Sequence, residues 1–211
     1  AGCRRARPPS APTAPAAPEP AVEFTWMGIT NWLVQTPHST VLLDAYFSRP
    51  LEGNASTPEG IETLLTVLDH AGVTAIDHIF VGHSHFDHAL DAGTAAIATG
   101  AQLWGSPTTC LIADAQGLPA ERCTVLTQGD ALSPSEDIGL RVARTPHWWP
   151  TVSGIGTHEE LDDKPAEAGV GDAPHGGVLT MHLDFGPHGT AVFQNTLGPL
   201  DADDGSGEDY P

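Results

Sequence analysis

The chain has 211 residues, of which 40% are hydrophobic, 23 are glycine and 19 are proline. This length suits one compact domain with a sizeable core, and the turn-rich composition excludes a helical bundle or a coiled coil. No apolar run reaches the roughly 18 residues that a membrane-spanning helix needs. From residue 21 onward there are 26 acidic and 5 basic residues. Such a charge repels phosphate backbones, so we expect a small-molecule substrate and no nucleic acid partner.

The first 20 residues are rich in proline and alanine and lack large apolar side chains. They cannot bury enough surface to fold, so we predict a disordered tether over 1–20. The opening Ala-Gly-Cys resembles the end of a bacterial lipobox, which follows a signal peptide and makes Cys3 the lipidated first residue of a lipoprotein. This predicts membrane attachment outside the cytoplasm, with a cytoplasmic protein as the alternative. Cys110 and Cys123 could pair in an oxidising compartment or remain two buried thiols.

The folded part is predicted to start with strands. The segments EFTWMGITNWLVQT (23–36) and STVLLDAY (39–46) are β-rich and flank a Pro-His turn, which predicts a hairpin. Residues 57–72 (TPEGIETLLTVLDHAG) place Ile61, Leu64, Leu65 and Leu68 on one helical face and end at a glycine, which predicts an amphipathic helix.

The rest of the chain alternates strands and helices. We predict a buried strand at 79–81, a histidine-rich loop, a helix through 95–99, strands in 101–106 and 124–133, and a helix over 109–116. A strand from 140 ends in a loop carrying His147, residues 153–176 are predicted as a surface insertion, and 178–185 with 190–197 form a last hairpin. This order indicates one layered α/β domain over 21–200, followed by an acidic, disordered tail over 201–211.

Three imidazoles and a carboxylate follow the strand at 79–81 within six residues: His83, His85, Asp87 and His88. Imidazole nitrogen and carboxylate oxygen are ligands suited to Zn²⁺ or iron. A loop at a strand end can turn these alternating side chains toward one point. The spacing therefore predicts a metal site rather than a solvated polar loop.

The string GHSHFDHALDAG resembles the signature loop of the metallo-β-lactamase fold. Upstream, WMGITNWLVQT and VLLDAYFSRP resemble the first hairpin of the lactonase-like and phospholipase-like branches of that superfamily, and downstream RVARTPHW resembles the segment that delivers a third histidine. The resemblance covers roughly residues 23–200 and implies an αββα sandwich. It also implies that Asp44, at a strand end, orients a histidine ligand from behind.

The same resemblance implies a metal-dependent hydrolase. His83, His85 and His147 would bind a first metal ion, and Asp87 and His88 would contribute to a second. The expected cofactor is one or two Zn²⁺ ions, with iron or manganese as alternatives. Metal-bound hydroxide would attack an ester, lactone, amide or phosphodiester, and Asp87 would act as the catalytic residue that positions the water or accepts its proton.

Two departures from the family pattern leave other functions open. Many relatives carry a bridging aspartate in a Gly-Asp-Thr type turn, whereas VFQNTLG places Asn195 at that position, which predicts a degenerate second metal site. The chain also ends before the last metal histidine of the family, so the domain is expected to be truncated at its C-terminus or to be a reduced variant. The alternatives are a catalytically silent metal-binding relative or gene fragment, and a nonheme iron enzyme on the same fold.

Overall fold

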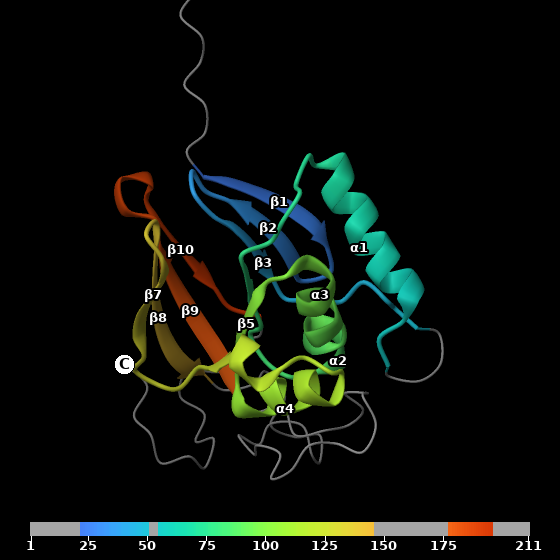
Figure 1. The fold of residues 1–211 in the computed structure, drawn as a ribbon. Coiled ribbons are helices and arrows are strands. Elements are labelled where there is room, and N and C mark those ends of the chain that lie inside the picture. Colours follow the sequence, from blue (N-terminus) through green and yellow to red (C-terminus); the bar gives the residue numbers. More distant parts are fainter. Residues whose placement is uncertain (1–21, 51–54, 146–176, 196–211) are drawn as a thin grey trace, which may run out of the picture.

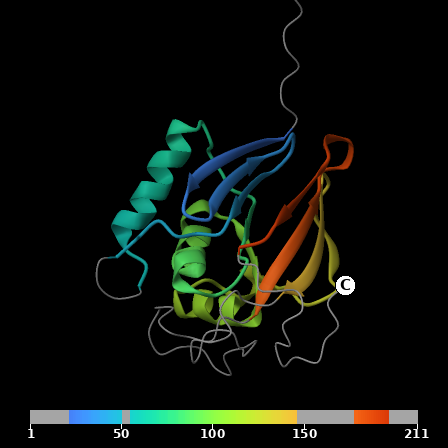
Figure 2. The same cartoon turned by 180° about the vertical axis from the view of Figure 1, so that it is seen from behind.

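A computed structural model of the chain describes residues 22–50, 55–145 and 177–195. Within these ranges, two β-sheets pack face to face, and the helices cover the outer face of the first sheet (Figures 1 and 2). The described residues thus contain three layers of the αββα sandwich that the sequence predicts. The predicted tether, the insertion at 153–176, the acidic tail and His147 all lie outside the described residues.

The first sheet has six strands in the order in which they occur along the chain: β1 (Glu23–Gly28), β2 (Asn31–Gln35), β3 (Thr40–Leu43), β4 (His78–Phe80), β5 (Gln102–Gly105) and β6 (Cys123–Val125). The first three strands pair antiparallel, and β3 to β6 run parallel. The carboxyl ends of β3 to β6 therefore meet at one edge of this sheet.

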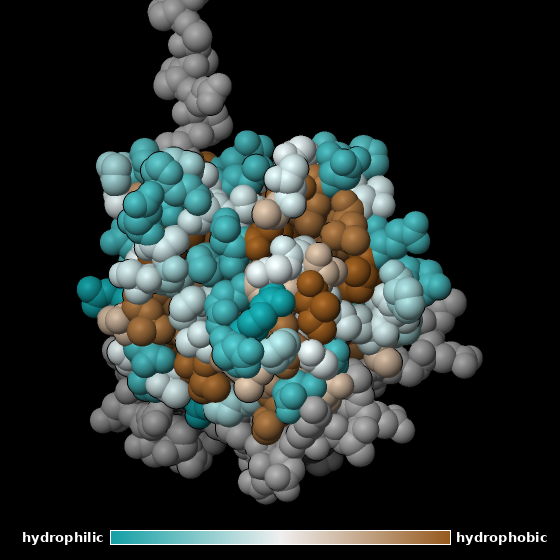
Figure 3. All heavy atoms as spheres, viewed as in Figure 1, coloured by the Kyte–Doolittle hydropathy of each residue, from teal (hydrophilic) through white to brown (hydrophobic). Residues whose placement is uncertain are grey.

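Four α-helices pack on the first sheet: α1 (Pro58–His70), α2 (Phe86–Ala89), α3 (Ala92–Thr99) and α4 (Pro107–Ala115). Thr57 caps α1, and Leu64 and Leu68 enter the core, so the predicted amphipathic helix is confirmed. Leu65, which the pattern assigned to the same face, is instead 44% exposed. It lies beside Ile61 and Ile97 in an apolar groove between α1 and α3. Figure 3 shows hydrophobic residues exposed on the face of the molecule that is drawn toward the viewer in Figure 1.

The second sheet is antiparallel, in the order β10 (Thr190–Phe193), β9 (Val178–Asp184), β8 (Ile138–Thr145) and β7 (Ala131–Ser135). Its inner side chains, such as Leu140 and Met181, pack on Val34 and Phe80 of the first sheet to form the second half of the core. Short 3₁₀ turns, η1 (Ala120–Arg122) and η2 (Gly186–His188), precede β6 and join β9 to β10. The predicted hairpin of 178–185 and 190–197 is confirmed for its described part.

Asp137 connects the two sheets at the edge opposite the carboxyl ends of β3 to β6. Its carboxylate accepts hydrogen bonds from the Thr36 hydroxyl, the His38 backbone N–H and the Ser39 hydroxyl, all in the turn between β2 and β3. Ser135, at the end of β7, donates a further bond at 2.9 Å. These bonds lower the pKa of Asp137 to about 2 although partial burial acts in the opposite direction.

Three further sequence predictions need correction. Residues 23–36 form two strands, β1 and β2, because Gly28 and Ile29 adopt positive φ angles of 96° and 55° and turn the chain back within the segment. Residues 124–133 contribute to both sheets, since β6 and β7 are separated by a turn at Gly129. The histidine-rich segment is a loop only up to His85, because Phe86–Ala89 form the helical turn α2.

Within the described ranges, we find no helix long and apolar enough to cross a membrane.

Candidate metal centre

Those predicted site residues that the structure describes gather at the carboxyl ends of the parallel strands. Asp44 directly follows β3, the His83–His88 segment follows β4, and Ser106 follows β5. The loop from 81 to 85 is fixed on both sides, since the Val81 N–H donates to the carbonyl of Trp104 and the Leu179 N–H donates to the carbonyl of Gly82. The topology of the fold therefore brings these polar groups together where α/β sheets commonly bind ligands.

His83 and His85 face each other within this loop. His83 Nε2 and His85 Nδ1 are 3.1 Å apart, and the ring centroids are separated by 4.8 Å. Two nitrogens that bind one tetrahedral zinc ion at 2.0–2.1 Å are separated by about 3.3 Å. Burial lowers the pKa of His85, and this keeps its imidazole neutral and able to coordinate a metal. The spacing and chemistry of this pair fit a shared metal ion.

The Asp44 side chain contacts His88, the kind of neighbour that the family resemblance implies for a residue at this strand end. The Asp44 Oδ2 atom lies 2.7 Å from His88 Nδ1, and both side chains are buried. A proton on Nδ1 that is donated to Asp44 leaves the Nε2 lone pair as the free ligand position of this ring. Burial lowers the pKa of His88, but the charge and hydrogen bond of Asp44, together with Asp87, outweigh this and raise the pKa above its usual value.

The backbone conformation of Asp44 is part of this arrangement. Its φ of 58° lies in the left-handed region, which is uncommon for a residue other than glycine. The Asp44 N–H donates to the Phe80 carbonyl, and the next residue, Ala45, donates to the His88 carbonyl. These two bonds tie the end of β3 to the end of β4 and to the last residue of the histidine segment, and they hold Asp44 in place.

Asp87 and His88 share the helical turn α2, but their side chains differ in exposure. The Asp87 side chain is 42% exposed, whereas that of His88 is 6% exposed. Asp87 Oδ2 lies 3.5 Å from His88 Nε2, on the side of the ring opposite to Asp44. A solvent-accessible carboxylate in this place can reach both a water molecule and a cation held by His88. The His83 ring packs against the His88 ring at an interplanar angle of 46°, with centroids 4.0 Å apart.

Asn195 also lies at this site, on the chain that follows β10. Its Nδ2 donates to Asp44 Oδ1 at 2.9 Å and to Asp44 Oδ2 at 2.7 Å, and it lies 3.0 Å from His88 Nδ1. Its Oδ1 is buried and has no hydrogen-bond partner in the described structure. Gly82 provides the space for this side chain, because a Cβ atom at position 82 would lie 2.1 Å from Asn195 Nδ2.

The sequence did not predict the buried cluster of hydroxyl groups around Ser84, the residue between His83 and His85. Ser84 Oγ lies 3.0 Å from Ser106 Oγ and 2.8 Å from Thr109 Oγ1, and at most 1% of each residue is exposed.

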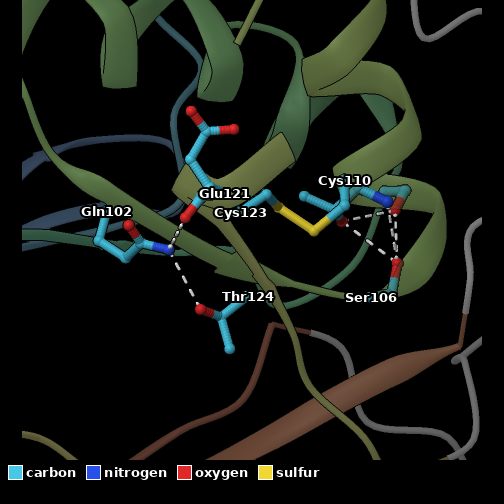
Figure 4. The surroundings of a disulfide bond; sticks show 8 residues. Gln102, Ser106, Cys110, Glu121, Cys123 and Thr124 are labelled. Atoms are coloured by element: carbon cyan, nitrogen blue, oxygen red, sulfur yellow. Dashed lines mark hydrogen bonds between the residues drawn. A yellow bond between two sulfur atoms is a disulfide. The ribbon is translucent and has the colours of Figure 1, made fainter. Parts of the chain in front are cut away.

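Ser106 caps the first turn of α4, and Cys110 in the same turn forms a disulfide with Cys123 of β6 (Figure 4). Of the two alternatives for these cysteines, the structure therefore has the paired form.

The third predicted ligand of the first metal, His147, lies outside the described residues. Among the residues that the structure describes, no three His, Cys, Asp or Glu side chains already surround a common point. The described part contains the His83–His85 pair, with Asp87 and His88 beside it. Within the same ranges, Asp44 and Asn195 contact His88 from behind.

Comparison with known proteins agrees with this architecture. No family model matches the sequence. A UPF0173 metal-dependent hydrolase from Myxococcus xanthus is 32% identical over 187 residues, which cover 88% of this chain and 56% of the relative. Igni18, a metallo hydrolase from Ignicoccus hospitalis, superposes with a TM-score of 0.53 at 15% identity over 84% of this chain and 62% of its own. A metallo-β-lactamase from Cronobacter sakazakii gives a TM-score of 0.51 at 15% identity, over 82% and 58% of the two chains. This chain has the metallo-β-lactamase fold.

The metallo-β-lactamase fold that the histidine motif predicted is thus confirmed, as is the α/β sandwich. The matched part amounts to between 28% and 56% of the length of the most similar curated relatives. The activity of the whole protein is therefore treated below as a proposal.

Proposed function

We propose that this chain carries the metal centre of a metal-dependent hydrolase that uses zinc. The observation that carries the proposal is the 3.1 Å separation of His83 Nε2 and His85 Nδ1 at the carboxyl edge of the parallel strands. His147 is proposed as the third ligand of the same ion. Asp87 and His88 Nε2 are proposed to face a second cation.

The residues of the chain have separate tasks in this proposal. A bound zinc ion lowers the pKa of water to about 7 and polarises the scissile bond. Asp87, with its exposed carboxylate, orients the attacking water and accepts its proton. Asp44 keeps the proton of His88 on Nδ1, so that Nε2 points toward the site. The proposed substrates are small molecules with an ester, lactone, amide or phosphodiester bond.

The first test is the metal content of the full chain, purified without chelator and measured by plasma mass spectrometry. We expect near-stoichiometric zinc in the wild type and its loss in His83→Ala, His85→Ala and His147→Ala. His38→Ala is the matched control, because the His38 side chain is 60% exposed and lies in the turn held by Asp137. A wild-type protein without bound metal would refute the proposal.

Turnover separates the hydrolase from its alternatives. The zinc-loaded wild type and Asp87→Asn are compared on generic esters, lactones and phosphodiesters, with free zinc as the background. Hydrolysis above background that Asp87→Asn loses supports the proposal. Zinc binding without any hydrolysis would favour the catalytically silent relative, and stoichiometric iron in place of zinc would favour the nonheme iron enzyme.

We further propose that the protein works outside the cytoplasm. The Cys110–Cys123 disulfide supports this location, because disulfides persist in oxidising compartments and are rare in the cytosol. Cys3 is the proposed lipid attachment site. Labelling with a radioactive fatty acid in cells tests this: incorporation that Cys3→Ser abolishes is expected, and equal labelling of both proteins would contradict it.

A further inference from the structure

The Asp44 carboxylate is the most densely hydrogen-bonded group of the site. Oδ1 accepts from the Gly82 N–H at 3.0 Å, Oδ2 lies 2.7 Å from His88 Nδ1, and Asn195 Nδ2 reaches both oxygens. Asp44 is fully buried, so these donors replace the water that would otherwise solvate its charge. Asn195 is the only one of the three donors that comes from the far end of the chain.

The hydrogen-bond pattern fixes the orientation of the Asn195 carboxamide. Both Asp44 oxygens are acceptors, so the atom that faces them must be the donor Nδ2. An ionised carboxylate at position 195 would place oxygen next to oxygen at about the same 2.7–2.9 Å and would remove two donors from a buried charge. The surroundings of residue 195 therefore select a neutral donor.

We propose that Asn195 is a positioning residue for the metal centre. Its amide clamps Asp44, and Asp44 in turn holds the His88 ring with Nε2 directed into the site. This assigns Asn195 a role different from that of a degenerate metal ligand. The inference rests on the proposed function, because it concerns the centre to which His88 contributes.

The two roles predict opposite effects of one substitution. If Asn195 positions Asp44, Asn195→Asp repels Asp44, disturbs His88 and weakens zinc binding by about tenfold, as loss of a group behind a metal ligand typically does. If residue 195 is a ligand position that has lost its charge, Asn195→Asp restores a ligand and gives tighter zinc binding or an additional ion.

The experiment is a zinc titration of the full chain against a chromophoric chelator, together with the absorption spectrum of the Co²⁺-loaded protein. The variants are Asn195→Asp, Asn195→Ala, Asp44→Asn and the double variant Asp44→Asn with Asn195→Ala. We expect Asn195→Asp and Asn195→Ala each to weaken zinc binding and to change the ligand-field bands of Co²⁺. Thermal unfolding of each metal-free variant shows that it is folded.

The double variant tests whether Asn195 acts through Asp44. In a double-mutant cycle, Asn195→Ala should weaken zinc binding when Asp44 is present and have little further effect in the Asp44→Asn background. Additive losses would overturn the inference, and so would tighter zinc binding by Asn195→Asp. A wild-type chain that binds no zinc refutes the proposed function itself. If the wild type binds zinc and the Asn195 variants bind it with the same affinity, only the positioning role is refuted.

Discussion

The hydroxyl of Thr109 lies 2.8 Å from the hydroxyl of Ser84, and Ser84 is the residue between His83 and His85. This contact joins the first turn of α4 to the centre of the metal loop. Ser106 closes the triangle, at 3.0 Å from Ser84 and 3.2 Å from Thr109. Three hydroxyls in a triangle can each donate one bond and accept one, which satisfies them without water.

Thr109→Val keeps the shape of this side chain and removes its hydroxyl. We expect a loss of about 1–3 kcal/mol in the free energy of unfolding, because buried hydroxyl partners are left unsatisfied. We also expect weaker zinc binding, since the loop that carries both histidines loses one of its anchors. Urea unfolding and a zinc titration measure the two effects.

Thr109→Ser is the matched control, since it keeps the hydroxyl and deletes the methyl group. It should lose about 1 kcal/mol of stability through the small cavity that remains, while zinc affinity stays near that of the wild type. Equal zinc affinity in the valine and serine variants would show that the hydroxyl does not position the loop.

Asp137→Asn should change the acid stability of the protein. The pKa of Asp137 is about 2 in the folded chain and about 3.9 in an unfolded one, so its ionised form favours folding. This contribution is fully present above about pH 4 and is lost as the pH falls from 4 to 2. After allowance for solvent screening, we expect about 1 kcal/mol at neutral pH.

Urea unfolding of the wild type and Asp137→Asn at several pH values measures this difference. It should be largest at neutral pH and shrink as the pH is lowered from 4 through 2. Glu136→Gln is the control, because the Glu136 side chain is 75% exposed and its neighbour at 3.6 Å, His38, is itself 60% exposed. A constant difference across the whole pH range would contradict the assigned role of Asp137.

The disulfide should contribute to stability through the unfolded state. Cys110 and Cys123 are 13 residues apart, and closing a loop of this length is worth roughly 3 kcal/mol in the chain-entropy estimate. The double variant Cys110→Ser with Cys123→Ser should therefore unfold at lower urea concentration. A reductant should shift the unfolding midpoint of the wild type toward that of the variant and leave the variant unchanged. An equal shift in both proteins would indicate another cause.

Removal of metal should destabilise the folded chain. A ligand present at 100 times its dissociation constant stabilises the folded state by about 2.7 kcal/mol. We therefore expect a chelator to lower the unfolding temperature of the wild type and to have no effect on the variant His83→Ala with His85→Ala. A chelator effect of the same size in this variant would place the bound metal elsewhere.

The local part of the site could be predicted from the sequence. The residues from His83 to His88 follow a buried strand, and the motif itself encodes their proximity. Asp44 could be placed through the resemblance to the metallo-β-lactamase fold, and the strand before it, β3, pairs with β4 in the structure. Even here, the helical turn α2 escaped prediction, because four residues carry too little periodicity to distinguish a turn of helix from a loop.

The contacts between distant residues could not be predicted. Ser84 meets Ser106 and Thr109, which are 22 and 25 residues away, and nothing in the pattern distinguishes these hydroxyls from those on the surface. Asn195 is separated from Asp44 by 151 residues, so only the folded chain shows that its amide meets a carboxylate.

The split of 23–36 into two strands depends on the positive φ of Ile29, a conformation for which isoleucine gives no signal.

The 151 residues between Asn195 and Asp44 also bear on the order in which the molecule folds. Contacts between residues close in sequence form early, because little chain entropy is lost in closing short loops. Asp44, the histidine segment and α4 all lie within the first sheet and its helices, whereas Asn195 follows β9 and β10 of the second sheet. On a ribosome, the histidines would thus emerge long before Asn195, and a metal ion captured at that stage would be held by a site without this side chain.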